Sequence, residues 1–430
     1  MKYYSINSPG KFVGLKEAVL RGLAADKGLY MPESLPSLPS DYFETIEKKT
    51  LAELGFETLS PFFCPDIKKE RFEELVTDAF NFEIPIKHIH DNIYTLELFH
   101  GPTCAFKDIG ARFMARVLSE FVKDMDKEIN ILVATSGDTG SAVANGFYNV
   151  PGINVFVLYP KGLVSDVQEK QFTTLGHNIT SIEVEGTFDD CQRMVKEAFM
   201  DVDLNNKLTL TSANSINLAR LLPQSIYYHY GYAQMKAQGH RSVTIGVPSG
   251  NFGNITAGFI ASKMGLPIKR FIAATNANDV VPEYLQTGIY KPRKSVATIA
   301  NAMDVGDPSN FIRIENLFGH HLDIVRKNID TFVFDDDQIR GYVKQVFDQT
   351  GYILDPHGAT GYGALKKGLA ENEVGFFIET AHPAKFPEVV ESIIGKKIPV
   401  PQRLQAFMKG TKQSVKINVG LDNLKQVLVK

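Results

Sequence analysis

The chain has 430 residues, of which 44% are hydrophobic and 22% are charged, as is usual for a globular protein with a large buried core. Its length predicts two or three domains, and its formal net charge of −3, without any block of like charges, argues against a nucleic-acid partner. The N-terminus has no hydrophobic signal segment and no apolar stretch reaches the roughly 18 residues of a membrane span, so we expect a soluble, cytoplasmic protein without a membrane partner.

The first part of the chain reads as a separate N-terminal domain. Residues 13–24 predict an amphipathic helix, and Pro32, Pro36 and Pro39 then mark a connection before further helical sequence to about residue 80. We therefore expect an N-terminal domain or cap over residues 1–92.

From Ile129 the pattern changes to short runs rich in Val and Ile that alternate with helical stretches. The runs are INILVA, INVFVLY, ITSIEV, SVTIGV and KRFIAA. Such runs are typical of strands that are buried on both faces of a parallel sheet. The sequence therefore predicts an α/β fold with a layered catalytic region over residues 93–390, followed by a tail, residues 391–430, packed on this core.

Three segments place glycines between a strand and a helix, although the strand is less clear in the third. They are ILVATSGDTGSAVANGF, SVTIGVPSGNFGNITAGFIA and YILDPHGATGYGAL. A glycine-rich turn lets backbone N–H groups converge at the start of a helix, where an anion is favoured, although such turns also serve as plain connections. Neither GxxxxGK[ST] nor a clean GxGxxG occurs, which argues against a P-loop NTPase and a dinucleotide-binding fold.

Lys107 is the candidate nucleophile. It follows the apolar residues Ala105 and Phe106, just ahead of a predicted helix whose apolar positions recur every four residues. Most lysines are solvated surface charges, but an apolar surrounding lowers the pKa of an ammonium toward the free amine that attacks an aldehyde. A covalent Schiff base at Lys107 is therefore a plausible chemistry.

A second candidate anion site lies in SANSINLAR. Ser215, Asn217 and Arg220 are expected in the first turns of a long helical stretch, with Asn217 and Arg220 on one helix face. The planar fork of arginine suits a phosphate, which would imply a substrate that carries its own phosphate. The alternative is that Ser215 caps the helix and Arg220 makes a structural ion pair.

The cysteines and histidines favour neither a disulfide framework nor a metal site. Cys64, Cys104 and Cys191 are far apart, which fits a reducing compartment, and Cys104 is interpreted as a small buried hydrophobe. The pairs His88/His90 and His320/His321 do not fit a zinc motif such as HExxH. We expect no catalytic metal.

Five ordered motifs, HGPTCAFKDIGARFM, TSGDTGSA, TSANSINLARLLPQ, PSGNFGN and ETAHPAKF, together with the N-terminal LKEAVLRGLAADKGLYMPE, resemble the threonine synthase family. This resemblance covers nearly the whole chain and is greater to the microbial and fungal branch than to the plant one. It implies the fold type II architecture of pyridoxal-phosphate enzymes, related to threonine dehydratase, cysteine synthase and the tryptophan synthase β chain. Pyridoxal 5'-phosphate is the implied cofactor.

The resemblance also implies site residues. Lys107 would form the internal aldimine, Thr380 would meet the pyridine nitrogen, although it could instead bond local backbone, and the cofactor phosphate would be held by backbone amides of Gly250, Asn251, Phe252, Gly253 and Asn254, with the hydroxyl of Ser249. Asp138 would lie near the cofactor 3'-oxygen, where the other branch carries Asn; a carboxylate there repels a phenolate unless one of the two holds a proton. The substrate would be bound by Ser136, Thr139 and Gly140 at its carboxylate and by Ser215, Asn217 and Arg220 at its phosphate.

The implied reaction converts O-phospho-L-homoserine and water to L-threonine and phosphate, with Lys107 as the main acid–base group. Two alternatives remain open. A phospholyase or dehydratase would use the same loops to make 2-oxobutyrate, and a non-catalytic homologue would bind the cofactor or a partner protein. The second anion site argues against dehydration of free threonine, and the intact lysine and glycine loop argue against a non-catalytic protein. The sequence makes no prediction of oligomeric state.

Overall fold

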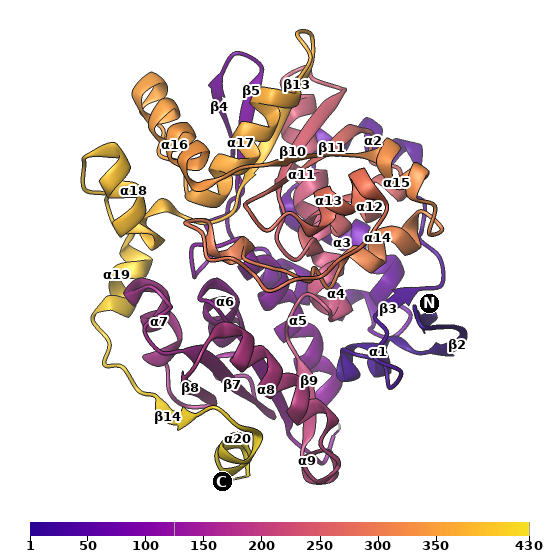
Figure 1. Cartoon of the computed structure of the whole chain (residues 1–430). Coiled ribbons are helices and arrows are strands. Elements are labelled where there is room, and N and C mark those ends of the chain that lie inside the picture. Colours follow the sequence, from indigo (N-terminus) through magenta and orange to yellow (C-terminus); the bar gives the residue numbers. More distant parts are fainter. Residues whose placement is uncertain (124, 430) are drawn as a thin grey trace.

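The computed structural model describes residues 1–123 and 125–429 and contains three sheets (Figure 1). The smallest, near the N-terminus, is antiparallel with strand order β2-β1-β3. Its strands are β1 Tyr3–Ser5, β2 Ser8–Val13 and β3 Tyr30–Pro32.

The largest sheet has six strands in the order β12-β11-β10-β13-β5-β4. Every neighbouring pair is parallel except β4 with β5, which form an antiparallel hairpin at one edge. The strands are β4 Ile86–His90, β5 Ile93–Glu97, β10 Val243–Pro248, β11 Ile268–Thr275, β12 Ile329–Val333 and β13 Val374–Glu379. The central strand β10 is buried along its whole length, as its mostly apolar sequence predicts.

The second parallel sheet has five strands in the order β14-β8-β7-β6-β9 and lies in the lower half of Figure 1. Its strands are β6 Ile129–Ala134, β7 Ile153–Pro160, β8 Ile179–Glu185, β9 Thr209–Ser212 and β14 Val415–Asn418. The five apolar runs of the sequence are therefore all strands, three of them in this sheet and two in the larger one. The predicted α/β layered core is confirmed.

Helices surround and join the two parallel sheets (Figure 1). They are α1 Leu15–Arg21, α2 Ser40–Glu44, α3 Leu51–Phe63, α4 Lys69–Ala79, α5 Lys107–Val122, α6 Asp138–Phe147, α7 Asp166–Thr173, α8 Phe188–Met200, α9 Val202–Lys207, α10 Leu218–Leu221, α11 Ser225–Ala237, α12 Gly253–Lys263, α13 Val280–Thr287, α14 Phe311–Leu317, α15 Leu322–Asn328, α16 Asp336–Thr350, α17 Pro356–Gly368, α18 Pro387–Ile394, α19 Gln402–Met408 and α20 Leu421–Leu428. Four short 3₁₀ helices are η1 Ile46–Lys48, η2 Leu222–Gln224, η3 Asn301–Met303 and η4 Pro383–Lys385.

Two local predictions need correction. The helix expected over 13–24 spans only Leu15–Arg21, because Gly14 is its N-cap and Gly22, at φ 67°, ends it in the left-handed region. The third glycine segment has no strand before its helix; instead the side chain of Asp355 accepts a hydrogen bond from the amide of His357 and caps α17.

The N-terminal and C-terminal segments are integrated with the two parallel sheets. The proposed boundary at residue 92 falls between β4 and β5, which pair with each other in the large sheet. The tail adds β14 to the edge of the five-stranded sheet and packs α20 against α8. The largest apolar cluster joins Leu54 and Phe72 of the N-terminal segment to Phe113 of α5. This shared core fixes α5 between the sheets, and α5 begins at Lys107.

No helix in residues 1–123 and 125–429 is long and apolar enough to cross a membrane.

Candidate active site

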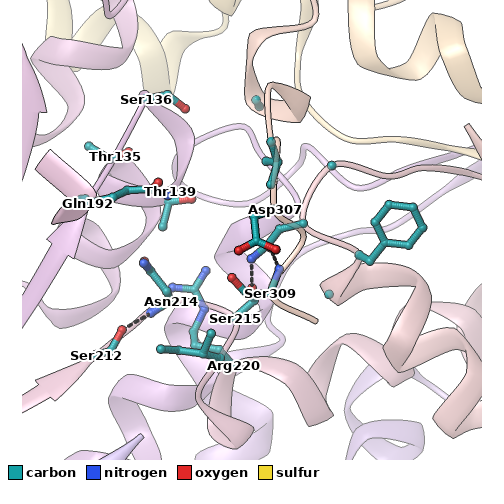
Figure 2. A pocket seen from close by; sticks show the side chains of 18 of the residues that line it. Thr135, Ser136, Thr139, Gln192, Ser212, Asn214, Ser215, Arg220, Asp307 and Ser309 are labelled. Atoms are coloured by element: carbon teal, nitrogen blue, oxygen red, sulfur yellow. Dashed lines mark hydrogen bonds between the residues drawn. The ribbon is translucent and has the colours of Figure 1, made fainter. Parts of the chain in front are cut away.

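A cavity of about 800 Å³ lies where the carboxyl ends of strands from both parallel sheets meet (Figure 2). Ser136 follows β6, Ser212 ends β9, Gly250 follows β10 and Thr380 follows β13, and all four line this cavity. Ligands of open α/β sheets bind at such crevices. The cavity therefore gathers loops that are far apart in the sequence.

Lys107 lines the cavity at the first position of α5. The buried carboxylate of Asp108 accepts hydrogen bonds from the amide of Thr103, at 2.8 Å, and from its hydroxyl, at 2.7 Å, which fixes the turn before the helix. The amide of Phe106 donates to the carbonyl of Thr380 at 2.8 Å. This bond holds the lysine loop beside the ETAHPAKF loop.

Burial lowers the pKa of Lys107 to about 8, while Asp138 opposes the shift and Arg220 and Lys385 add to it. An amine with this pKa is unprotonated in about a tenth of molecules at pH 7, against roughly 0.03% for an ordinary lysine. Lys107 is thus a far better nucleophile at neutral pH than a surface lysine.

The loop after β10 has the geometry of an anion cradle. Phe252 adopts the left-handed conformation at φ 59°, and α12 begins at Gly253. Amides in the first turn of a helix have no intrahelical acceptor, so they are available to an anion. A Cβ at Gly250 would lie 2.7 Å from the Cα of Met303, so only glycine fits there without a shift of the backbone.

Two side chains of this loop form hydrogen bonds with backbone carbonyls at the end of β10. The hydroxyl of Ser249 donates to the carbonyl of Val247 at 2.8 Å, and Ser249 does not line the cavity. The amide group of Asn254 donates to the carbonyl of Pro248 at 2.7 Å. Both bonds hold the loop in shape.

The SGDTG loop contributes Ser136, Asp138 and Thr139 to the cavity. Gly140 lies behind them, and its amide donates to the hydroxyl of Thr135 at 2.8 Å. Its amide is therefore already bonded within the protein, unlike the donor role expected for it.

Asp138 is paired with a lysine that the sequence analysis did not single out. Its Oδ1 lies 2.6 Å from the Nζ of Lys385 and accepts a 2.8 Å hydrogen bond from Gln168. Burial by itself would raise the pKa of Asp138, but the ammonium groups of Lys385 and Lys107 outweigh it and lower the pKa to about 2. The carboxylate is therefore ionised at neutral pH.

Arg220 lies on the other side of the cavity from the SGDTG loop, near Asn214 and Ser215 (Figure 2). Its Nη1 donates to the carbonyl of Ala213 at 2.7 Å, whereas its buried Nε has no hydrogen-bond partner among the residues described. No salt bridge joins it to a carboxylate in that part of the chain, so the structural ion pair considered for Arg220 is not formed. Burial lowers its pKa to about 10, so it remains charged at neutral pH.

Arg313 is also buried, and it too has no salt bridge to a carboxylate among the residues that the structure describes. Its guanidinium donates to the carbonyls of Ser215, Tyr30 and Ile216, and it therefore ties the SANSIN loop to the N-terminal segment. Arg220 lines the cavity and makes one such bond, and its Nε has no partner among the described residues.

Asn217 does not belong with Ser215 and Arg220 in the cavity, and the long helix expected there is interrupted. Asn217 is the N-cap of the short helix α10: its side chain accepts from the amide of Ala219 at 3.0 Å and donates to the carbonyl of Val19 at 2.8 Å. Ser215 precedes the helix, and its hydroxyl accepts from Asn251 at 3.1 Å. The cap role expected for Ser215 is thus taken by Asn217.

Of the predicted site residues, most line one cavity: Lys107, Ser136, Asp138, Thr139, Ser215, Arg220, Gly250, Asn251, Phe252, Gly253, Asn254 and Thr380. Ser249, Gly140 and Asn217 lie outside it. Sequence reasoning missed Asn214, whose buried Oδ1 has no partner among the described residues, and Lys385. Both lie within quoted motifs, SANSINLAR and ETAHPAKF, but nothing in their spacing distinguished them.

Cys104 does not line the cavity. Cys104 is buried, and burial raises the pKa of its thiol to about 12. Within residues 1–123 and 125–429 no group of three or more His, Cys, Asp or Glu side chains is placed to hold a metal ion.

Comparison with known proteins agrees with this geometry. Residues 79–378 match the family model described as pyridoxal-phosphate dependent enzyme, and residues 2–80 and 358–428 match models of the threonine synthase N-terminus and C-terminal region. Threonine synthase from Haemophilus influenzae is 46% identical over 94% of both chains. The crystal structure of threonine synthase from Escherichia coli superimposes with a TM-score of 0.94 at 41% identity, over 100% of this chain and 99% of that one. PLP-bound threonine synthase from Brucella melitensis gives 0.92 at 32% identity, over 100% and 98%. The chain therefore belongs to the threonine synthase family of pyridoxal-phosphate-dependent enzymes.

Proposed function

We propose that this enzyme converts O-phospho-L-homoserine and water to L-threonine and phosphate. The observation that carries the proposal is the pairing of two anion sites around one amine. The glycine loop after β10 and the buried guanidinium of Arg220 line the same cavity as Lys107. A cofactor phosphate and a substrate phosphate require two such sites.

The donor set fits pyridoxal phosphate. The amides at the start of α12 suit its phosphate, Lys107 is a reactive amine in the same cavity, and the side chain of Thr380 lines the cavity beside the lysine loop. When bound, the cofactor supplies an electron sink that stabilises the negative charge formed at substrate Cα and Cβ.

The residues of the chain supply positioning and proton transfer. Arg220 holds the substrate phosphate, and the hydroxyls of Ser136 and Thr139 donate to its carboxylate. The Nζ of Lys107 removes a proton from Cα and then one from Cβ, and phosphate leaves from Cγ. A proton is delivered to Cγ, which becomes the methyl group, water adds its hydroxyl at Cβ, and a proton returns to Cα from the same amine. The pKa near 8 suits such a group, because it can both accept and donate protons near neutral pH.

The lowered pKa of Lys107 predicts how apoenzyme takes up pyridoxal phosphate. The rate should rise roughly 15-fold between pH 6.5 and 8 and level off above about pH 9, because only the free amine reacts. An ordinary lysine would keep gaining about tenfold per pH unit through pH 9. Stopped-flow absorbance of apoenzyme mixed with the cofactor measures the rate, and N-acetyl-lysine run in parallel corrects for titration of the cofactor itself. A rate that still rises about fivefold or more from pH 9 to 10 would contradict the proposed role of burial.

The main product should be threonine, because a closed site retains the unsaturated intermediate until water adds. Escape of that intermediate would give 2-oxobutyrate and ammonia, and a difference of about 1.4 kcal/mol between the two barriers makes a tenfold product ratio. Chromatography of a complete turnover of O-phosphohomoserine, with a lactate dehydrogenase assay for 2-oxo acid, separates the two outcomes. Phosphate release matched mainly by 2-oxobutyrate would assign the site to a phospholyase.

A further inference from the structure

A second lysine, Lys385, is buried behind the cavity. It ends the 3₁₀ helix η4, its side chain is fully enclosed, and it does not line the cavity. Its Nζ lies 2.6 Å from Oδ1 of Asp138 and donates to the carbonyl of Thr103 at 2.9 Å. Lys385 is therefore separated from the cavity, whereas its partner Asp138 lines it.

The Asp138–Lys385 pair connects the part of the chain around the five-stranded sheet with the part around the six-stranded sheet. Asp138 begins α6, which follows β6 of the five-stranded sheet, while Lys385 follows β13 of the six-stranded sheet. Gln168 of α7 holds the same carboxylate oxygen at 2.8 Å, and the hydroxyl of Ser165 holds the carbonyl of Lys385 at 3.2 Å. Both charged groups are thus fixed in position before any ligand binds.

The charged groups around the pair show what the loss of the Lys385 ammonium would do to Asp138. Lys107 interacts electrostatically with Asp138, Lys385 and Arg220, and the thiol of Cys104 interacts with both members of the pair and with Asp108 and Arg403. Asp108 is already held by Thr103. Removal of the Lys385 charge would therefore leave Asp138 as an unpaired carboxylate facing Lys107.

We propose that Lys385 is a positioning residue that neutralises Asp138 and thereby sets the electrostatic potential at Lys107. This proposal deepens the proposed function and depends on it. An unpaired carboxylate would repel a phenolate-like oxygen of a bound cofactor. Because Asp138 is paired with Lys385, the two charges together act toward the cavity as a dipole, and this repulsion is reduced. A buried ion pair usually adds little stability compared with apolar side chains of similar size, so stability alone does not account for it.

The test uses holoenzyme and three variants: Lys385→Met, Asp138→Asn and the double variant that carries both changes. The visible absorption of the bound cofactor is recorded from pH 5.5 to 10, and the midpoint of its pH-dependent change reports the potential at the nitrogen of Lys107. An unpaired carboxylate favours positive charge on that nitrogen, so Lys385→Met should raise the midpoint by about 1 unit or more. Asp138→Asn leaves an unpaired ammonium and should lower it, whereas the double variant, with both charges removed, should return to within about 0.3 unit of wild type.

Lys412→Met is the matched control. Lys412 pairs with Glu183 at 2.7 Å and with Glu169, in the same half of the molecule but away from the cavity. It should lower thermal stability without moving the midpoint. The dissociation constant of the cofactor, measured by dialysis, should rise in both single variants at the pair and return toward the wild-type value in the double variant.

Single variants at the pair that lower only thermal stability, as Lys412→Met does, would overturn the proposal. If Lys385→Met does not fold, Asp138→Asn and the double variant still decide, since the proposal requires a lowered midpoint in the first and its recovery in the second. Failure of the proposed function would appear elsewhere, as wild-type enzyme that forms no threonine while its spectrum still responds to the pair.

Discussion

Lys107→Ala should yield a folded protein that is colourless after addition of pyridoxal phosphate and that has lost turnover by about 10³-fold or more. The variant lacks both the amine to which the cofactor attaches and the group that moves the substrate protons, and general acid–base catalysis alone contributes about 10²–10⁴-fold. Because the side chain lies at the first turn of α5 and faces the cavity, its removal should leave the fold intact. Absorbance, circular dichroism and a phosphate-release assay measure the three properties.

Borohydride reduction of wild-type holoenzyme identifies the attachment site directly, because it makes the bond to the cofactor permanent. Peptide mass analysis should locate the cofactor on Lys107. Lys294 is the matched control, since it is an exposed lysine that lines the same cavity. Lys294→Ala should remain coloured and labelled at Lys107. A label on Lys294, or on Lys385, would show that the assignment of Lys107 is wrong.

The sequence predicted the layered α/β core, the family and the cofactor, because these depend on local patterns. Buried parallel strands are continuous apolar runs, and INILVA corresponds in full to β6. Glycine positions were similarly informative: Gly250 lies where a Cβ would meet the backbone of Met303. The family relationship expected from five motifs is confirmed by matches across the chain.

What the sequence could not supply were features that depend on contacts between distant segments. Strand β14 is short and largely exposed, and only its pairing with β8 identifies it. Asn217 looked like a ligand residue because helical spacing placed it beside Arg220, but it is an N-cap whose partner, Val19, lies 198 positions away. The partner of Asp138 is Lys385, and a separation of 247 positions, from 138 to 385, gives no sequence signal. Each of these is a tertiary contact between polar groups, for which periodicity carries no information.

Arg220→Ala should lower kcat/KM for O-phosphohomoserine by roughly 30- to 1000-fold while cofactor occupancy stays near that of wild type. The loss of a charge-assisted, two-pronged contact to a phosphate costs about 2–4 kcal/mol. The guanidinium is buried with an unpartnered Nε and has no direct salt bridge among the described residues, although the charge of Asp108 acts on it, so a bound phosphate would be its direct counter-ion. Arg220→Lys keeps the charge but loses the planar fork of donors, so its kcat/KM should lie between those of the wild type and Arg220→Ala.

The control for Arg220 is Arg293, an exposed arginine that lines the same cavity but is already paired with Asp279 and Glu283. Because exposed pairs contribute little, Arg293→Ala should change kcat/KM by less than about threefold. Inorganic phosphate should inhibit the wild-type enzyme competitively and should inhibit Arg220→Ala much less, which separates loss of phosphate binding from a general distortion of the cavity. An Arg220→Ala protein that purifies folded but colourless would mean that this guanidinium holds the cofactor phosphate, and the glycine loop after β10 would then be the site for the substrate.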